Sequence, residues 1–116
     1  MADEIVYYAG DSKTIRFNFI GSDGGPLVID PDISVLTLSI KFRDTYDDLV
    51  LQKASNVAEE GAVIDGPQGI VEFYFLSADT VNLRPLRMIY DVRMVTGSDI
   101  LTLLKSVFDL QLPVNR

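Results

Sequence analysis

In LTLSIKF, at residues 36–42, every second residue is large and apolar, and the residues between them are polar. Successive side chains of a β-strand point to opposite faces of the sheet, so this spacing predicts a strand with one buried face. Six further stretches fit the same pattern, the last two less strongly: residues 14–19, 71–75, 88–94, 100–112, 5–8 and 49–52. The alternation therefore predicts an all-β protein.

The residues between these stretches favour turns. Residues 22–26 (SDGGP) and 65–69 (DGPQG) supply glycines that accept positive φ and prolines that cannot continue a strand ladder. Residues 96–99 (TGSD) are typical of a hairpin turn. Within residues 100–112, Leu103 and Leu104 break the alternation, and a β-bulge there would restore it.

About seven short strands with regular turns predict an immunoglobulin-like antiparallel β-sandwich, with a partly open barrel left open as the alternative. Cys and Trp are absent, so the Cys–Trp–Cys arrangement of antibody domains is excluded. Two segments have weak helical character: residues 76–83, with Ser77 as the cap, and residues 56–60. The predicted core consists of Phe17, Phe19, Leu38, Phe42, Phe73, Phe75, Tyr90 and Val92.

The chain of 116 residues is expected to form a single domain, residues 1–116. Its net charge of −7 comes from 17 acidic and 10 scattered basic residues, which argues against nucleic-acid or anionic-membrane binding. The first residues, MADE, do not resemble a signal peptide, and the apolar runs are far too short to span a bilayer. A soluble protein made in the cytoplasm is the expectation.

The absence of His and Cys removes the usual catalytic triads and dyads, together with imidazole and thiolate metal sites. The sequence therefore predicts no enzyme, no catalytic residue, no cofactor and no metal. Lys105 and Ser106 are adjacent in a predicted strand, so their side chains should point to opposite faces. Six acidic residues that could be considered for carboxylate chemistry are instead expected to be solvated in turns or on polar strand faces: Asp11, Asp23, Asp65, Asp99, Glu72 and Asp91.

Two features leave alternatives open. Residues 43–48 (RDTYDD) hold the densest acidic cluster, Asp44 to Asp48, which is either a solvated hairpin loop or a cation site. The spacing of an EF-hand is missing, because no central Gly and no closing Glu are present. Tyr74 should face away from Phe73 and Phe75, where it is either simply exposed or part of a subunit contact; no partner-contact residue is assigned.

The order of several segments resembles a known family. GDSKTIRF (10–17), DGGPLVI (23–29), LSIKF (38–42) and GIVEF (69–73) come first. SADT (77–80), IYDVRM (89–94), LTLL (101–104) and PVNR (113–116) follow. The series is similar to the immunoglobulin-like domain at the N-terminus of phage upper baseplate proteins, and to small stand-alone phage and prophage proteins that share its pattern.

The resemblance implies a non-enzymatic structural component of a phage or prophage tail, baseplate or neck. Its expected partners are other phage structural proteins and further copies of itself, through protein–protein assembly. Its expected place is the virion, assembled in the bacterial host cytoplasm. The length fits a stand-alone tail, neck or head–tail joining protein better than a receptor-binding-protein carrier. The alternative is an immunoglobulin-like adhesion or carbohydrate-binding module unrelated to phage.

Overall fold

The computed structural model describes residues 4–42 and 49–113, which hold eight strands, one short α-helix, α1 (Ser77–Thr80), and one 3₁₀-helix, η2 (Gly66–Gln68). All seven predicted strands are present, and an eighth, residues 61–65, was missed because its sequence, GAVID, is short and begins with glycine. The strands are β1 (Ile5–Tyr8), β2 (Lys13–Asn18), β3 (Ser34–Lys41), β4 (Leu49–Ala54), β5 (Gly61–Asp65), β6 (Ile70–Phe75), β7 (Leu86–Thr96) and β8 (Asp99–Gln111).

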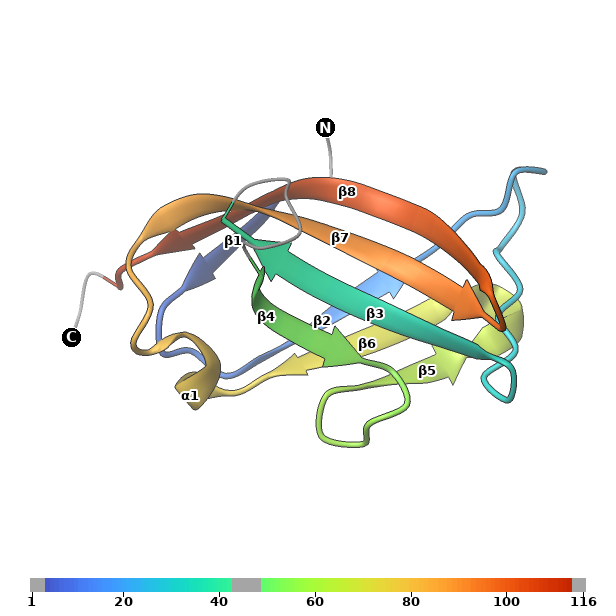
Figure 1. The fold of residues 1–116 in the computed structure, drawn as a ribbon, viewed down its shortest axis with the longest axis horizontal. Coiled ribbons are helices and arrows are strands. Elements are labelled where there is room, and N and C mark those ends of the chain that lie inside the picture. The colour runs from blue at the N-terminus through green and yellow to red at the C-terminus, as the bar shows by residue number, and fades with distance from the viewer. Residues whose placement is uncertain (1–3, 43–48, 114–116) are drawn as a thin grey trace.

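The strands form two sheets that face each other across the core (Figure 1). The larger sheet has the order β1-β8-β7-β3-β4, and the smaller one the order β2-β6-β5. All described pairs of strands are antiparallel except β1 with β8, which is parallel, and the larger sheet curls into half a barrel. The all-β prediction is therefore confirmed.

The long hairpin of β7 and β8 turns at Gly97 and Ser98 and spans the larger sheet (Figure 1). Gly97 has φ +61 at the first central position, the pattern of a type II′ turn, which matches the natural twist of a hairpin. Val92 aligns with Leu104 and Arg93 with Thr102, so Leu103 is the extra residue of a bulge. The sequence prediction of a bulge at this point is confirmed.

The core is rich in aromatic side chains from both sheets. Phe17 lies 6.1 Å from Phe73 and 6.2 Å from Tyr90, measured between ring centroids. Pairs of rings at such distances add about 0.5–1.5 kcal/mol to the free energy of unfolding beyond their buried area. Seven of the eight predicted core residues pack here, with Phe17 only partly buried.

Phe42 does not belong to the core, and that prediction was wrong. Its side chain is 48% exposed, although the alternation from Leu36 through Ile40 places it on the inward face. β3 ends at Lys41, where its register with β4 shifts, so Phe42 lies outside the strand whose alternation would hold it against the core. The alternation of apolar residues does not show by itself where a strand ends or where its inward face ceases to be buried.

The two helical predictions had different outcomes. Residues 77–80 form α1, but Ser77 is its first residue and not its cap. The N-cap is Leu76, whose backbone N–H donates to the Asp79 carboxylate at 2.7 Å. Residues 56–60 form turns instead of a helix, closed by the N–H of Glu60 donating to the carbonyl of Val57.

Candidate interaction edge

The acids singled out in the sequence do not converge on one place. No group of three or more His, Cys, Asp or Glu residues with metal-binding geometry occurs within residues 4–42 and 49–113. The acidic stretch Asp44 to Asp48 lies outside the described residues. Asp23 accepts a hydrogen bond from the N–H of Gly25, and Asp65 accepts one from the N–H of Gln68, so both acids stabilise turns.

Asp91 is an exception to the prediction of a solvated surface acid, which was wrong for this residue. It is only 5% exposed, because it lies in the middle of the larger sheet, aligned with Ser39 on one side and Lys105 on the other. Its Oδ2 atom is 3.6 Å from Nη2 of Arg93. Strands on both sides, and not its own sequence, determine its burial.

Lys105 and Ser106 point to opposite faces, as the alternation predicts. Lys105 is exposed and aligned with Asp91, whereas Ser106 is half-buried and aligned with the fully buried Tyr90. Tyr74, on the outward face of β6, is half-buried.

The main open feature is one edge of β8. β1 pairs with β8 only from Phe108 to Gln111. Among the described residues, the stretch of β8 from Asp99 to Leu104 pairs with β7 alone. Backbone N–H and C=O groups along such an edge are available to pair with another strand.

The chain turns away from β8 directly after β1. The N–H of Ala9 makes the last backbone bond to β8, to the carbonyl of Gln111 at 2.9 Å. Gly10 then takes φ +88 and donates its N–H to Oγ1 of Thr80, the last residue of α1. β1 runs parallel to β8 from Phe108 towards Gln111, so it covers the end of β8 and not the stretch from Asp99 to Leu104, and the chain then crosses to the smaller sheet.

The open stretch of β8 is apolar and faces a groove. Ile100 and Leu101 are 64% and 52% exposed. A groove of about 360 Å³ runs beside them between β8 and β2, lined by Leu103, Leu104 and residues 16–20. β2 is itself unpaired on this side among the described residues, so both walls of the groove are strand edges.

The edges at β4 and β5 carry features that oppose strand addition. Lys53, in edge strand β4, points inward and is 5% exposed, with Nζ 2.7 Å from Oδ2 of Asp79. An inward charge and a short length are ways in which natural edge strands avoid pairing. β5 is five residues long and loses its register with β6 after Val63. The sequence analysis missed Lys53, although alternation from Leu49 and Leu51 places residue 53 on the inward face.

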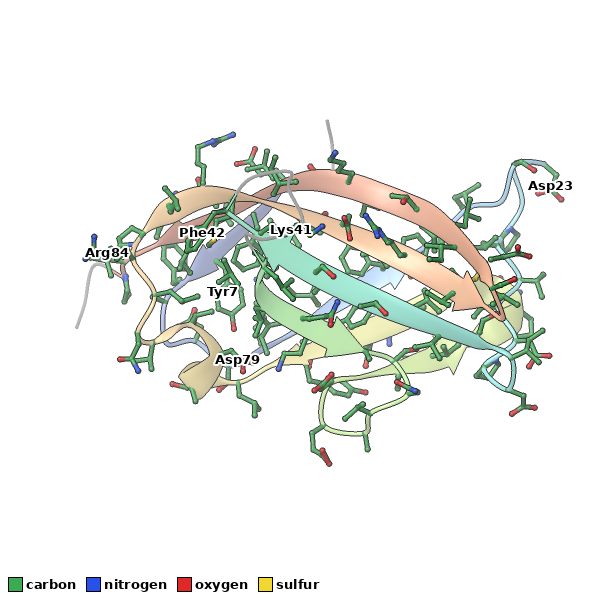
Figure 2. The ribbon with its side chains drawn as sticks, viewed as in Figure 1. Tyr7, Asp23, Lys41, Phe42, Asp79 and Arg84 are labelled. Carbon is green, nitrogen blue, oxygen red and sulfur yellow. The ribbon has the colours of Figure 1, made fainter. Side chains whose placement is uncertain are left out.

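Tyr7 fixes β1 against the far end of β8 (Figure 2). Its ring stacks on Phe108 at 5.7 Å, and its hydroxyl donates to the carbonyl of Asp11 at 2.6 Å. Burial, with smaller contributions from the carboxylates of Asp11 and Asp79, raises the pKa of Tyr7 from 10.0 to about 12. The neutral phenol is therefore the form that the fold stabilises.

This shift predicts a loss of stability at high pH. Because the folded-state pKa lies above the unfolded value, the contribution of Tyr7 is complete below about pH 10 and falls as the pH rises towards 12. Tyr7→Phe should cost about 1 kcal/mol at pH 8, from the lost hydrogen bond, and should lack this alkaline component. Urea unfolding of both proteins at pH 8, 10 and 11 checks it. A constant difference in the free energy of unfolding across this range would contradict the prediction.

A second recess lies at the end of the molecule near α1. It is mainly apolar, with a volume of about 550 Å³, and includes Phe42, Leu83, Leu86 and Met88. Arg84 lies at this end as well (Figure 2). The ring of Phe42 lines this recess, and the described residues around it contribute neither a carboxylate nor a hydroxyl group.

Comparison with known proteins adds no relative. No protein-family model matches this sequence, and no curated protein matches it. No helix among the described residues has the length and apolar character needed to cross a membrane.

Proposed function

We propose that this chain is a non-enzymatic, immunoglobulin-like assembly module that joins other protein chains through the open edge of β8. The observation that carries the proposal is the stretch of β8 from Asp99 to Leu104, which among the described residues pairs with β7 alone and exposes Ile100 and Leu101 beside a groove. Addition of a strand to such an edge gains backbone hydrogen bonds and covers apolar side chains in one step.

The order of the strands supports the immunoglobulin-like part of the proposal. In an immunoglobulin sandwich, strands B, E and D lie in one sheet and G, F and C in the other, and variable-type domains add C′ beside C. Here β2-β6-β5 matches B-E-D, and β8-β7-β3-β4 matches G-F-C-C′. The position of strand A beside B has no strand among the described residues, since β1 pairs with β8 instead.

The phage context rests on the resemblance of the ordered segments to phage baseplate and prophage proteins. We place the chain in the virion, as a component of the tail, baseplate or neck, assembled in the host cytoplasm beside other structural proteins. Repeated symmetric copies make modest contacts sufficient, because each interface recurs around the assembly.

Substitution of Ile100 tests the role of the edge. Ile100→Lys adds a charge where a partner strand would pack and should reduce incorporation of the chain into purified phage particles at least about tenfold. Ile100 is 64% exposed, so the free energy of unfolding should change by less than about 1 kcal/mol. Quantitative mass spectrometry of particles from induced prophages gives the measurement.

Ile64→Lys is the matched control, because Ile64 is 45% exposed on β5, at the other edge of the smaller sheet. This variant should enter particles at the level of the unchanged chain. If complete particles form without the chain at all, the assembly role fails. Binding to a glycan array in place of particles would favour the carbohydrate-binding module instead.

A further inference from the structure

The segment between β2 and β3 exposes large apolar side chains to solvent. Val28, Ile20 and Ile33 are 70%, 66% and 62% exposed, which makes them the three most exposed large apolar side chains outside β8 among the described residues. The segment lies at the end of the sandwich where β3 begins and β7 ends (Figure 1). Exposed apolar residues that gather in one place are typical of a protein–protein contact.

The same end of the sandwich is acidic. Asp65 lies there because the N–H of Ile29 donates to the carbonyl of Gly66 at 2.8 Å. The segment and the strands beside it, residues 17–40 and 94–104, contain no Lys or Arg. Within residues 4–42 and 49–113, four exposed carboxylates of this end make no ion pair: Asp23, Asp30, Asp32 and Asp65.

Hydrogen bonds and one buried side chain stabilise the segment. The carboxylate of Asp30 accepts the N–H of Asp32 at 3.0 Å, and its carbonyl accepts the N–H of Ser34 at 2.9 Å. Ile29 is buried in the core, whereas the adjacent Val28 faces solvent. A surface that is ordered before binding loses less conformational entropy when a partner docks.

Four described residues adjoin undescribed ones, and they lie at the opposite end of the strands: Glu4, Phe42, Leu49 and Pro113. Phe42 and Leu49 flank the far end of β3, whose first residue lies next to the segment. Pro113 follows β8, and Glu4 lies 3.4 Å from Arg87, near the start of β7. Residues 20–33 are therefore flanked by described residues.

The acidic charge determines the chemistry of the partner. Nucleic acids and anionic membranes are repelled by it. A metal ion lacks a ligand set, since no three acidic side chains converge in the part of the chain that the structure describes. A second copy supplies too few cations, because every described Lys and Arg except Lys13 and Arg84 already has a partner. A basic segment of another protein, with apolar side chains of its own, satisfies both the charge and the exposed apolar area.

We propose that residues 20–33 form a docking surface for a basic, apolar segment of another protein, which covers Ile20, Val28 and Ile33 and places Lys or Arg beside the carboxylates. Opposite charges around an apolar contact raise the association rate and reject partners of the wrong charge. Asp23, at the tip of this end, is well placed to meet such a partner first (Figure 2). The surface is separate from the open stretch of β8, so its use goes beyond the proposed function and gives one chain two contacts.

The probe for this surface is a short synthetic peptide of Lys and Leu spaced by Gly and Ser. Titrated into the isotopically labelled full chain, it should bind with a dissociation constant of about 10–100 μM at low salt. The shifted amide resonances should belong to residues 20–33 and 65–69. A peptide with Ser in place of Leu should bind at least about tenfold more weakly, since it leaves the apolar side chains uncovered. A peptide with Glu in place of Lys should not bind.

Two matched pairs of variants separate this surface from the overall charge and hydrophobicity of the chain. Val28→Ser should weaken peptide binding at least about threefold, whereas Val6→Ser, at a residue of β1 that is 43% exposed, should not. Asp32→Asn should weaken binding by about threefold. Asp11→Asn removes the same charge after β1, at the other end of the molecule, and should leave binding unchanged.

Three results overturn the proposal: no binding of the peptide, shifted amides outside residues 20–33 and 65–69, or equal binding by the two variants of a pair. Shifts of residues 20–33 that depend on protein concentration without peptide would identify a second copy as the occupant and would overturn it as well.

Discussion

Phe108→Ala is expected to lower the free energy of unfolding by about 4 kcal/mol, the largest effect among the substitutions considered. Phe108 is 1% exposed and lies between two other rings, 5.7 Å from Tyr7 and 6.0 Å from Phe75. Removing its ring leaves a cavity and takes contacts from β1, β6 and β8 at once. Large-to-small changes at such sites combine lost transfer free energy with the cost of the cavity.

The substitution also affects the strand beside β8, because Phe108 aligns with Ile5 at the start of β1. A cavity at this position weakens the attachment of β1 to β8. Hydrogen exchange of the β1 amides should therefore become faster in Phe108→Ala than is explained by the lower global stability alone.

Phe42→Ala is the matched control, since the same ring is removed from a position that is 48% exposed. Its cost should be less than about 1 kcal/mol. Urea unfolding of both variants, followed by tyrosine fluorescence, measures the difference. Equal costs at the two positions would contradict the placement of Phe42 outside the core.

Asp79→Ala is expected to lower the free energy of unfolding by about 3 kcal/mol, because it leaves the ammonium group of Lys53 buried without its carboxylate. The side chains of Lys53 and Asp79 are only 7% and 17% exposed, and they are 2.7 Å apart. Asp79 also accepts the N–H of Leu76, so the same change removes the bond that begins α1.

The ammonium group of Lys53 also contacts an aromatic ring. Its Nζ lies 5.8 Å from the centroid of the Phe75 ring, and a cation over an aromatic face contributes about 0.5–2 kcal/mol. This contact cannot replace an ion pair, since it supplies no hydrogen-bond acceptor of comparable strength.

The double variant Lys53→Met with Asp79→Ala separates the buried charge from the lost packing. Met keeps the aliphatic volume without the charge, so the double variant should recover at least about 1 kcal/mol relative to Asp79→Ala alone. Thermal and urea unfolding of the four proteins in this cycle provide the numbers. A double variant less stable than Asp79→Ala would show that Lys53 stabilises the fold without Asp79.

Lys53 also affects association between chains. It is the inward charge that protects edge strand β4, whereas β8 from Asp99 to Lys105 has no inward Lys or Arg. Lys53→Met should therefore increase nonspecific association through β4, which light scattering detects in the same samples.

Local pattern predicted most of the fold from the sequence. Strand alternation identified seven of the eight described strands, and the pair Leu103 and Leu104 identified the bulge. These features depend on residues near one another in the chain, because the two faces of a strand alternate with period two whatever its neighbours are. Absence of His and Cys likewise limited the chemistry without any structure.

The tertiary structure alone decided which strands are neighbours and which surfaces stay open. The burial of Asp91, the inward ion pair of Lys53 and the exposure of Phe42 all depend on strands distant in the sequence. β1 pairs with only four residues at the end of β8, Phe108 to Gln111, and among the described residues the stretch from Asp99 to Leu104 pairs with β7 alone. The pairing of strands and the burial of their faces depend on residues far apart in the sequence. The alternation along one strand therefore determines which side chains share a face but not which strands lie beside it.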